Sequence, residues 1–187
     1  CPGASICLAK VLEDQSGRLS LWTGPRTEVT CFAASGALRR NVYNRHKANT
    51  AAVRGRTTET ILGMLRAAMP KDAGIIRIHV SGDFYSLAYL RAWVALAKER
   101  PDVLFYSYSK SLPFLSQVAS EIPINLRITL SAGGRYDAMM QDFPGWSVAH
   151  IVDHPDNARR MGLEIDHDDS HAAIGLKDFA LLVHGIQ

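Results

Sequence analysis

The sequence contains few cysteines and no long hydrophobic run. Cys1, Cys7 and Cys31 are its only cysteines among 187 residues. An odd and sparse count argues against the disulfide framework of a small secreted protein, which uses many cysteines in even number. No stretch approaches the roughly 20 consecutive apolar residues of a membrane-spanning helix, so we expect no membrane partner. A reducing compartment fits this composition best.

The length allows an ordinary hydrophobic core. A chain of 187 residues can bury roughly 70% of the surface that its unfolded form exposes. Metal ions or disulfides are therefore not needed to make such a chain fold. We expect a single domain over residues 1–187, in which a cysteine-bearing and basic segment (1–56) precedes a series of βα repeats (57–187).

Acidic residues are absent between Val29 and Thr58. The same segment carries six cations, namely Arg39, Arg40, Arg45, Lys47, Arg54 and Arg56. Acids predominate instead between Asp153 and Ser170. Two interpretations remain open: the basic segment is a solvated helix face that meets the acidic one, or it binds an anionic partner. For nucleic acid, Arg39, Arg40, Arg45 and Lys47 would contact phosphates, with Tyr43 among them for stacking.

Helical and strand patterns alternate from residue 57 onward. Helices are predicted over 57–68, 87–100, 113–120, 135–141 and 155–161, and strands over 75–80, 103–109, 124–130, 146–152 and 179–184. Such alternation is typical of an α/β fold with a parallel sheet and right-handed crossovers. Because the chain is too short for eight units, we predict a partial βα barrel or curved parallel sheet of about four to six strands.

One alternating set of residues is polar in three successive strands. We assign this polar set to a single face of the sheet: Arg77, His79, Ser81, Ser107, Ser109, Asn125, Arg127, Thr129 and Ser131. The opposite set is apolar or aromatic and includes Ile76, Tyr106, Tyr108 and Ile128. Since parallel strands covered on both faces usually form continuous apolar runs, we expect the polar face to turn inward toward a site.

The predicted strands end in small and polar residues. Their carboxyl ends are Ser81-Gly82-Asp83, Ser109-Lys110-Ser111, Ser131-Ala132-Gly133-Gly134 and Asp153-His154. Ligands of parallel sheets and βα barrels gather at these ends. We therefore expect Asp83 and Lys110, together with Arg77 and Arg127 of the polar face, to hold an anionic or polar cofactor or ligand.

The cysteines follow the pattern Cys-x5-Cys-x23-Cys. Three thiolates are one short of a closed tetrahedral zinc site, which a histidine could complete, and they also suit a cubane iron–sulfur cluster with one iron left open. His154 and His171 are the histidines considered for a Cys3His zinc site. A Cys7–Cys31 disulfide and three inert thiols remain the alternatives.

Several short motifs are spread over most of the chain: Cys1-Pro2-Gly3-Ala4, Cys7, the run from Cys31 to Gly36, the run from Arg77 to Ser86 with its Ser-Gly-Asp-Phe-Tyr-Ser core, and the run from Phe105 to Ser111. In these motifs the chain resembles the mycobacteriophage gene-product-88 family of phage and plasmid proteins. Cysteines ahead of βα repeats are also similar to radical S-adenosylmethionine proteins, whose three-cysteine cluster lies at the mouth of a partial barrel.

The resemblance implies a 4Fe–4S cluster held by Cys1, Cys7 and Cys31, with His171 as a further candidate ligand. The 23 residues between Cys7 and Cys31 depart from the compact Cys-x3-Cys-x2-Cys loop of the radical enzymes, which argues against S-adenosylmethionine. A phage-encoded protein of this kind would be expected in the host cytoplasm. Neither a reaction nor a redox role follows from the resemblance.

Overall fold

The computed structural model describes residues 10–22 and 36–183. Cys1, Cys7 and Cys31 lie outside the described residues, and so does His184. Within the described ranges, none of the helices combines the length and the hydropathy that a membrane crossing requires.

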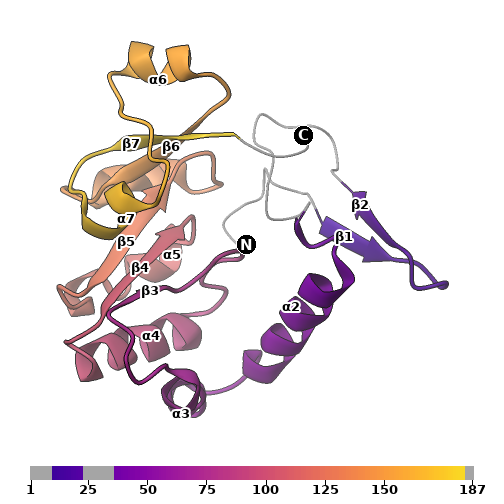
Figure 1. Ribbon diagram of the computed structural model, residues 1–187. Helices are drawn as coiled ribbons and strands as arrows, with labels where there is room; N and C mark the ends of the chain where they lie inside the picture. The colour runs from indigo at the N-terminus through magenta and orange to yellow at the C-terminus, as the bar shows by residue number, and fades with distance from the viewer. Residues whose placement is uncertain (1–9, 23–35, 184–187) are drawn as a thin grey trace.

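A curled sheet of five parallel strands forms a half-barrel (Figure 1). Its strands are β3 (Ile75–Arg77), β4 (Leu104–Ser109), β5 (Leu126–Ser131), β6 (Val148–Val152) and β7 (Phe179–Leu182). They lie in sequence order, β3-β4-β5-β6-β7, so each connection returns the chain to the neighbouring position. This order is that of a βα barrel, and the predicted curved parallel sheet is confirmed.

Three helices cover the convex face of the sheet. They are α3 (Thr58–Ala68), α4 (Leu87–Glu99) and α5 (Leu112–Leu115). Thr57 and Ser86 begin the first two, because their hydroxyl oxygens accept hydrogen bonds from backbone N–H groups of the first turn. The apolar stripe of α4, which includes Leu90 and Leu96, packs against Phe105 of β4. Each fully buried side chain of this size stabilises the fold by about 1.5–3 kcal/mol.

Further along the chain the helices are short. The helix predicted over 113–120 is divided between α5 and the 3-10 helix η1 (Ala119–Glu121), and the helix predicted over 135–141 is the 3-10 helix η2 (Asp137–Asp142). Helix α6 (Pro155–Met161) has the predicted bounds, and Gly162 ends it in the left-handed region at φ 69°. Ala158 of α6 packs with Val152 and Ala180 of the sheet.

The concave face is occupied by a short helix, α7 (Ser170–Ile174). Its Ala172 packs with Ala149 of β6 and Phe179 of β7, and the rings of Tyr106 and Tyr108 of β4 lie against this group. The small side chain of alanine allows the helix to approach the strands closely. The inner face that we expected to be open to a ligand is therefore partly filled by the protein itself.

The predicted polar face is wrong in strand β4. Tyr106 pairs in register with Arg77 and Arg127, whereas Ser107 is opposite Ile128. Tyr106 and Tyr108 therefore share the concave face with the two arginines, and Ser107 and Ser109 are buried on the helix-covered face. Both faces of β4 are covered, so polarity alone could not distinguish them.

The first strand of the half-barrel is shorter than predicted. It ends at Arg77, and the bend at Ile78 breaks the alternation, so that His79 turns to the helix-covered side. There its Nδ1 lies 3.2 Å from Ser107 Oγ and its Nε2 lies 3.3 Å from the Tyr89 hydroxyl. Asn125 also faces a helix, since it donates to the Ala97 carbonyl at 2.9 Å.

The amino-terminal part forms a separate arm. An antiparallel hairpin of β1 (Lys10–Glu13) and β2 (Leu19–Trp22) is followed by the longer helix α2 (Arg40–Val53). Figure 1 shows the hairpin and α2 standing to one side of the half-barrel. Tyr85 contacts α2 by donating from its hydroxyl to the Val53 carbonyl at 3.0 Å.

Candidate functional site

Asp83 ties two strand ends together at the carboxyl edge of the half-barrel. Its carboxylate accepts hydrogen bonds from the Ser109 hydroxyl at 2.7 Å and from the backbone N–H groups of Lys110 at 2.8 Å and Phe84 at 2.7 Å. Burial raises the pKa of Asp83, although these hydrogen bonds oppose the shift. The loop after β3 is thereby fixed to the end of β4.

Lys110 makes the corresponding connection between β4 and β5. Its Nζ donates to the carbonyl of Ser131 at 2.9 Å, to the Ser131 hydroxyl at 3.0 Å and to the carbonyl of Ala132. A Cβ at Gly134 would lie 3.2 Å from the Lys110 Cβ, so this loop passes closely over the lysine stem. Asp83 and Lys110 thus lie at the predicted edge, and the hydrogen bonds described here are all made to the protein's own loops.

A charged cluster lies on the concave face around Asp169. The Asp169 carboxylate accepts from Arg77 Nη1 at 2.5 Å, from the Tyr106 hydroxyl at 3.1 Å and from the Tyr108 hydroxyl at 2.8 Å. The Arg77 guanidinium also lies 5.3 Å from the centre of the Tyr108 ring. Asp169 holds these contacts at φ 65°, a left-handed conformation that is uncommon for a residue other than glycine.

The cluster keeps both tyrosines protonated. Burial, together with the nearby Asp169 carboxylate, raises the pKa of Tyr108 and the pKa of Tyr106. Sequence reasoning found Arg77 and missed Asp169, Tyr106 and Tyr108. The i, i+2 spacing of the tyrosines was a usable signal for a shared face, whereas Asp169 had no feature that set it apart from its acidic neighbours.

Arg127 also lies on the concave side, and its surroundings differ from those of Arg77. Its Nε is buried without a hydrogen-bond partner. Within the described ranges, the guanidinium forms no ion pair. It lines a cavity of about 250 Å³ near the amino end of β5, together with Thr129, Trp146 and Ser147. Arg127, one of the four predicted ligand-holding residues, thus lines a cavity.

The histidines considered as metal ligands are dispersed. His171 Nε2 lies 2.9 Å from Glu164 Oε2, and this contact is the main reason that the pKa of His171 is raised. His154 caps α6, with its Nδ1 accepting from the Asp156 N–H at 3.2 Å. Among residues 10–22 and 36–183, no group of three or more His, Cys, Asp or Glu side chains could hold a metal ion.

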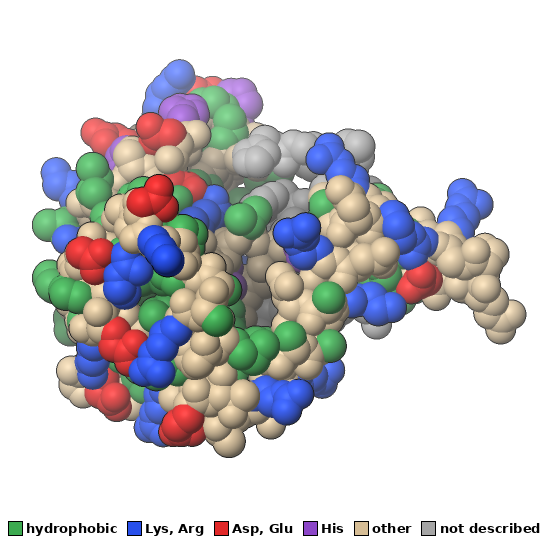
Figure 2. Space-filling view, turned by 60° about the horizontal axis from the view of Figure 1, so that its bottom comes forward, with side chains coloured by type: hydrophobic (Ala, Val, Ile, Leu, Met, Phe, Trp, Pro, Cys, Tyr) green, Lys and Arg blue, Asp and Glu red, His purple; other side chains and the backbone are tan. Residues whose placement is uncertain are grey.

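Helix α2 presents the basic segment to solvent. None of its residues is buried, and Figure 2 shows Lys and Arg side chains gathered over this arm. Arg40 and Lys47 pair with Glu13 of the hairpin, Lys47 at 3.3 Å. The acidic residues 153–170 make no ion pair with this helix in the part of the chain that the structure describes. Those described contacts give no support to the interpretation in which the two segments neutralise each other.

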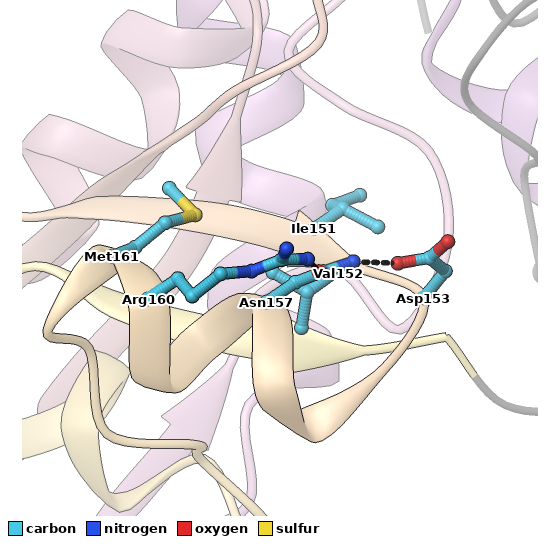
Figure 3. A pocket seen from close by; sticks show the side chains of 6 residues that line it. All are labelled: Ile151, Val152, Asp153, Asn157, Arg160 and Met161. Atoms are coloured by element: carbon cyan, nitrogen blue, oxygen red, sulfur yellow. Dashed lines mark hydrogen bonds between the residues drawn. The ribbon is translucent and has the colours of Figure 1, made fainter.

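A second pocket lies at the surface between β6 and α6. A surface depression of about 360 Å³ is lined by Ile151, Val152, Asp153, Asn157, Arg160 and Met161 (Figure 3). Asn157 bridges its polar side by donating to Asp153 and accepting from Arg160. The side chains of Asp153 and Arg160 are thus both hydrogen-bonded to Asn157. The other lining residues, Ile151, Val152 and Met161, are apolar.

Comparison with known proteins assigns the chain to a family. The family model for Gene product 88 matches residues 1–187. The Gene 88 protein of Mycobacterium phage L5 is 32% identical over 81 residues, which cover 40% of this chain and 34% of that relative. No solved structure matches the chain. The match over the whole length confirms the resemblance seen in the cysteine and Ser-Gly-Asp-Phe-Tyr-Ser motifs, and the chain belongs to the Gene product 88 family of phage proteins.

Proposed function

We propose that this protein binds a 4Fe–4S cluster through Cys1, Cys7 and Cys31. The observation that supports the proposal is the half-barrel with strands in sequence order, preceded in the chain by three thiols within 31 residues. Thiolate is the preferred protein ligand of such clusters. In βα barrels the loops at the carboxyl ends of the strands are where cofactors are held.

The carboxyl edge offers a rigid wall for such a cofactor. Asp83 and Lys110 hold the ends of β3, β4 and β5 together through hydrogen bonds of 2.7–3.0 Å. A rigid support keeps a ligand set in a fixed geometry. Their proposed role is therefore to position the loops that surround the cofactor, while the thiolates supply the metal–ligand bonds.

His171 is not required by this proposal. The imidazole Nε2 is engaged by Glu164, and Asp166 Oδ1 lies 3.7 Å from its Nδ1. Three protein thiolates would leave one iron open to a non-protein ligand. A His171→Gln variant should therefore retain as much iron as the unchanged protein.

Anaerobic purification followed by iron, sulfide and zinc analysis tests the proposal. We expect about four iron and four sulfide per chain, with broad absorption near roughly 400 nm that dithionite bleaches. Replacement of Cys31 by Ser should remove most of the iron. Zinc bound in a ratio of about one per chain would instead indicate a structural Cys3His site, and a colourless protein without iron would contradict the cluster.

A second candidate function is nucleic-acid binding by the amino-terminal arm, through the basic residues on and beside α2. It is favoured by the exposure of α2, whose 14 residues include none that is buried. Arg39 and Arg45 form no ion pair with a described residue, so their charge is not neutralised there. Lys47 Nζ lies 5.1 Å from the centre of the Tyr43 ring, which places an aromatic surface among the cations.

Fluorescence anisotropy with labelled mixed-sequence single-stranded DNA and RNA tests this second function. Each phosphate contact contributes roughly 0.7 to the slope of log affinity against log salt. Replacement of Arg39 and Arg45 by Ala should therefore reduce the slope by about 1.4. Arg91→Ala is the matched control, since Arg91 is an exposed arginine on α4. Binding that is absent or insensitive to salt would rule out this function.

A further inference from the structure

Strand β5 is paired with β6 only at its carboxyl end. They are paired only through Leu130 with Val148 and Ser131 with Ala149. Before these pairs a cavity of about 250 Å³ opens beside the first half of β5, the residues that precede β6 and the end of α7. This cavity is remote from the carboxyl edge, so it is independent of the proposed cluster.

The cavity contains one cationic side chain and no acidic one. Arg127 lines it, and the buried Nε of Arg127 has no hydrogen-bond partner. Arg77, on the same face of the sheet, has its charge balanced by Asp169. A guanidinium has no acceptor atom and presents a planar fork of donors. An anion in this cavity would supply the acceptor that Arg127 lacks.

The remaining lining residues indicate which chemical groups the uncharged part of such a ligand would have. Ile122, Trp146 and Leu176 supply the apolar part of the wall, and the polar part, which is somewhat larger, includes the residues Thr129 and Ser147 with their hydroxyl groups. Ligand sites commonly combine apolar walls with a few polar groups that fix orientation. Pockets for drug-sized ligands measure roughly 300–1,000 Å³, so a cavity of about 250 Å³ suits a smaller molecule.

We propose that this cavity binds a small monocarboxylate with a compact apolar or aromatic body. The planar fork of Arg127 matches the two oxygens of a carboxylate, which can accept two parallel hydrogen bonds. One guanidinium balances the single charge of a carboxylate, whereas a phosphate monoester brings nearly two charges and no second cation lines the cavity. The side chains of Ile122, Trp146 and Leu176 would then contact the hydrocarbon part of the ligand, and the hydroxyl groups of Thr129 and Ser147 would lie beside its polar part.

Titration with benzoate tests the proposal, and benzamide provides a neutral molecule of almost the same shape. Binding is followed by calorimetry and by the change in tryptophan fluorescence, because Trp146 lines the cavity. We expect benzoate to bind about tenfold or more tightly than benzamide or inorganic phosphate, since a charged hydrogen-bonded pair distinguishes them. Equal binding of benzoate and benzamide, preferential phosphate binding or no benzoate binding at millimolar concentration would each overturn the proposal.

An Arg127→Met variant tests the role of the guanidinium directly. Methionine keeps an unbranched apolar stem, and Arg127 has no described hydrogen bond to lose, so the variant should melt at the same or a higher temperature. It should bind benzoate about tenfold or more weakly, while Arg91→Met should bind as the unchanged protein does. Undiminished benzoate binding by a folded Arg127→Met variant would refute the assignment. If the variant does not fold, the affinities of the unchanged protein for benzoate and for benzamide still test whether the cavity binds a carboxylate.

Discussion

His79 makes the stability of this protein sensitive to mild acid. Its ring is enclosed by Ser107, Tyr89 and Phe84, with the Phe84 ring centre 4.9 Å away in an edge-on contact. Burial, assisted by the positive charge of Arg77, lowers the pKa of His79 to about 4. The unfolded chain has a histidine pKa of about 6.5. Between these two values the unfolded state therefore binds a proton that the folded state does not.

The sign and size of the effect follow from this difference. The stabilisation is fully present above about pH 6.5 and is lost as the pH falls toward 4, because protonation then favours the unfolded chain. At about pH 4.5 the loss amounts to about 2.5 kcal/mol of unfolding free energy. Urea unfolding near pH 7 and near pH 4.5 gives the loss of unfolding free energy between the two pH values. The loss measured for His79→Gln is subtracted from the loss measured for the unchanged protein, and the difference is the contribution of His79.

His171 provides a control of opposite sign. The Glu164 carboxylate raises the pKa of His171, so the stabilisation by its protonated form is present below about pH 6.5 and is lost as the pH rises through the folded-state value. Glu164 is largely exposed, which screens the pair and keeps this effect small. If His79→Gln loses as much free energy between the two pH values as the unchanged protein does, the reasoning from burial is refuted.

Four further substitutions test individual contacts by their effect on urea unfolding at neutral pH. Asp169→Asn removes the charge that balances Arg77 and should cost about 1–3 kcal/mol; an unchanged midpoint would show that solvent replaces the carboxylate. Asn125→Asp places a carboxylate where the amide now donates at 2.9 Å to three carbonyl oxygens, and should cost about 3 kcal/mol or more. Gly175→Ala puts a Cβ 2.5 Å from a backbone carbonyl oxygen of α7 and should cost about 1–3 kcal/mol. Gly63→Ala is its control: the added Cβ would lie in open space on α3, and the variant should be more stable by about 0.5–1 kcal/mol. Equal effects of the two glycine variants on the unfolding free energy would contradict the geometry.

Local patterns predicted the architecture well. The helix over 155–161 has the predicted bounds, because Pro155 starts it and Gly162 can adopt the left-handed conformation that ends it. The strands were found from their β-branched and aromatic runs, and their alternation with helices predicted the parallel sheet. Strand ends differed by a few residues, most of all in β3, where the bend at Ile78 was not visible in an otherwise alternating run.

The chemistry of the concave face was predicted less well, for a physical reason. Arg77 and Asp169 are 92 residues apart, and no local pattern in one sequence joins residues at such a distance. Tyrosine also fits either face of a sheet, since it has an apolar ring and a polar hydroxyl. The alternation in β4 was therefore read with the wrong face inward, although the residues at the carboxyl edge, Asp83 and Lys110, were placed correctly.

The sequential order of the strands has a consequence for synthesis on the ribosome. Each strand of the half-barrel after β3 pairs with the strand that precedes it in the chain, so every new strand pairing closes a loop of only one βα unit. The sheet can then grow at one edge as the chain emerges, without waiting for the carboxyl terminus. Among the described elements, helix α7 and strand β7 emerge last; α7 then covers the concave face and β7 adds the fifth strand.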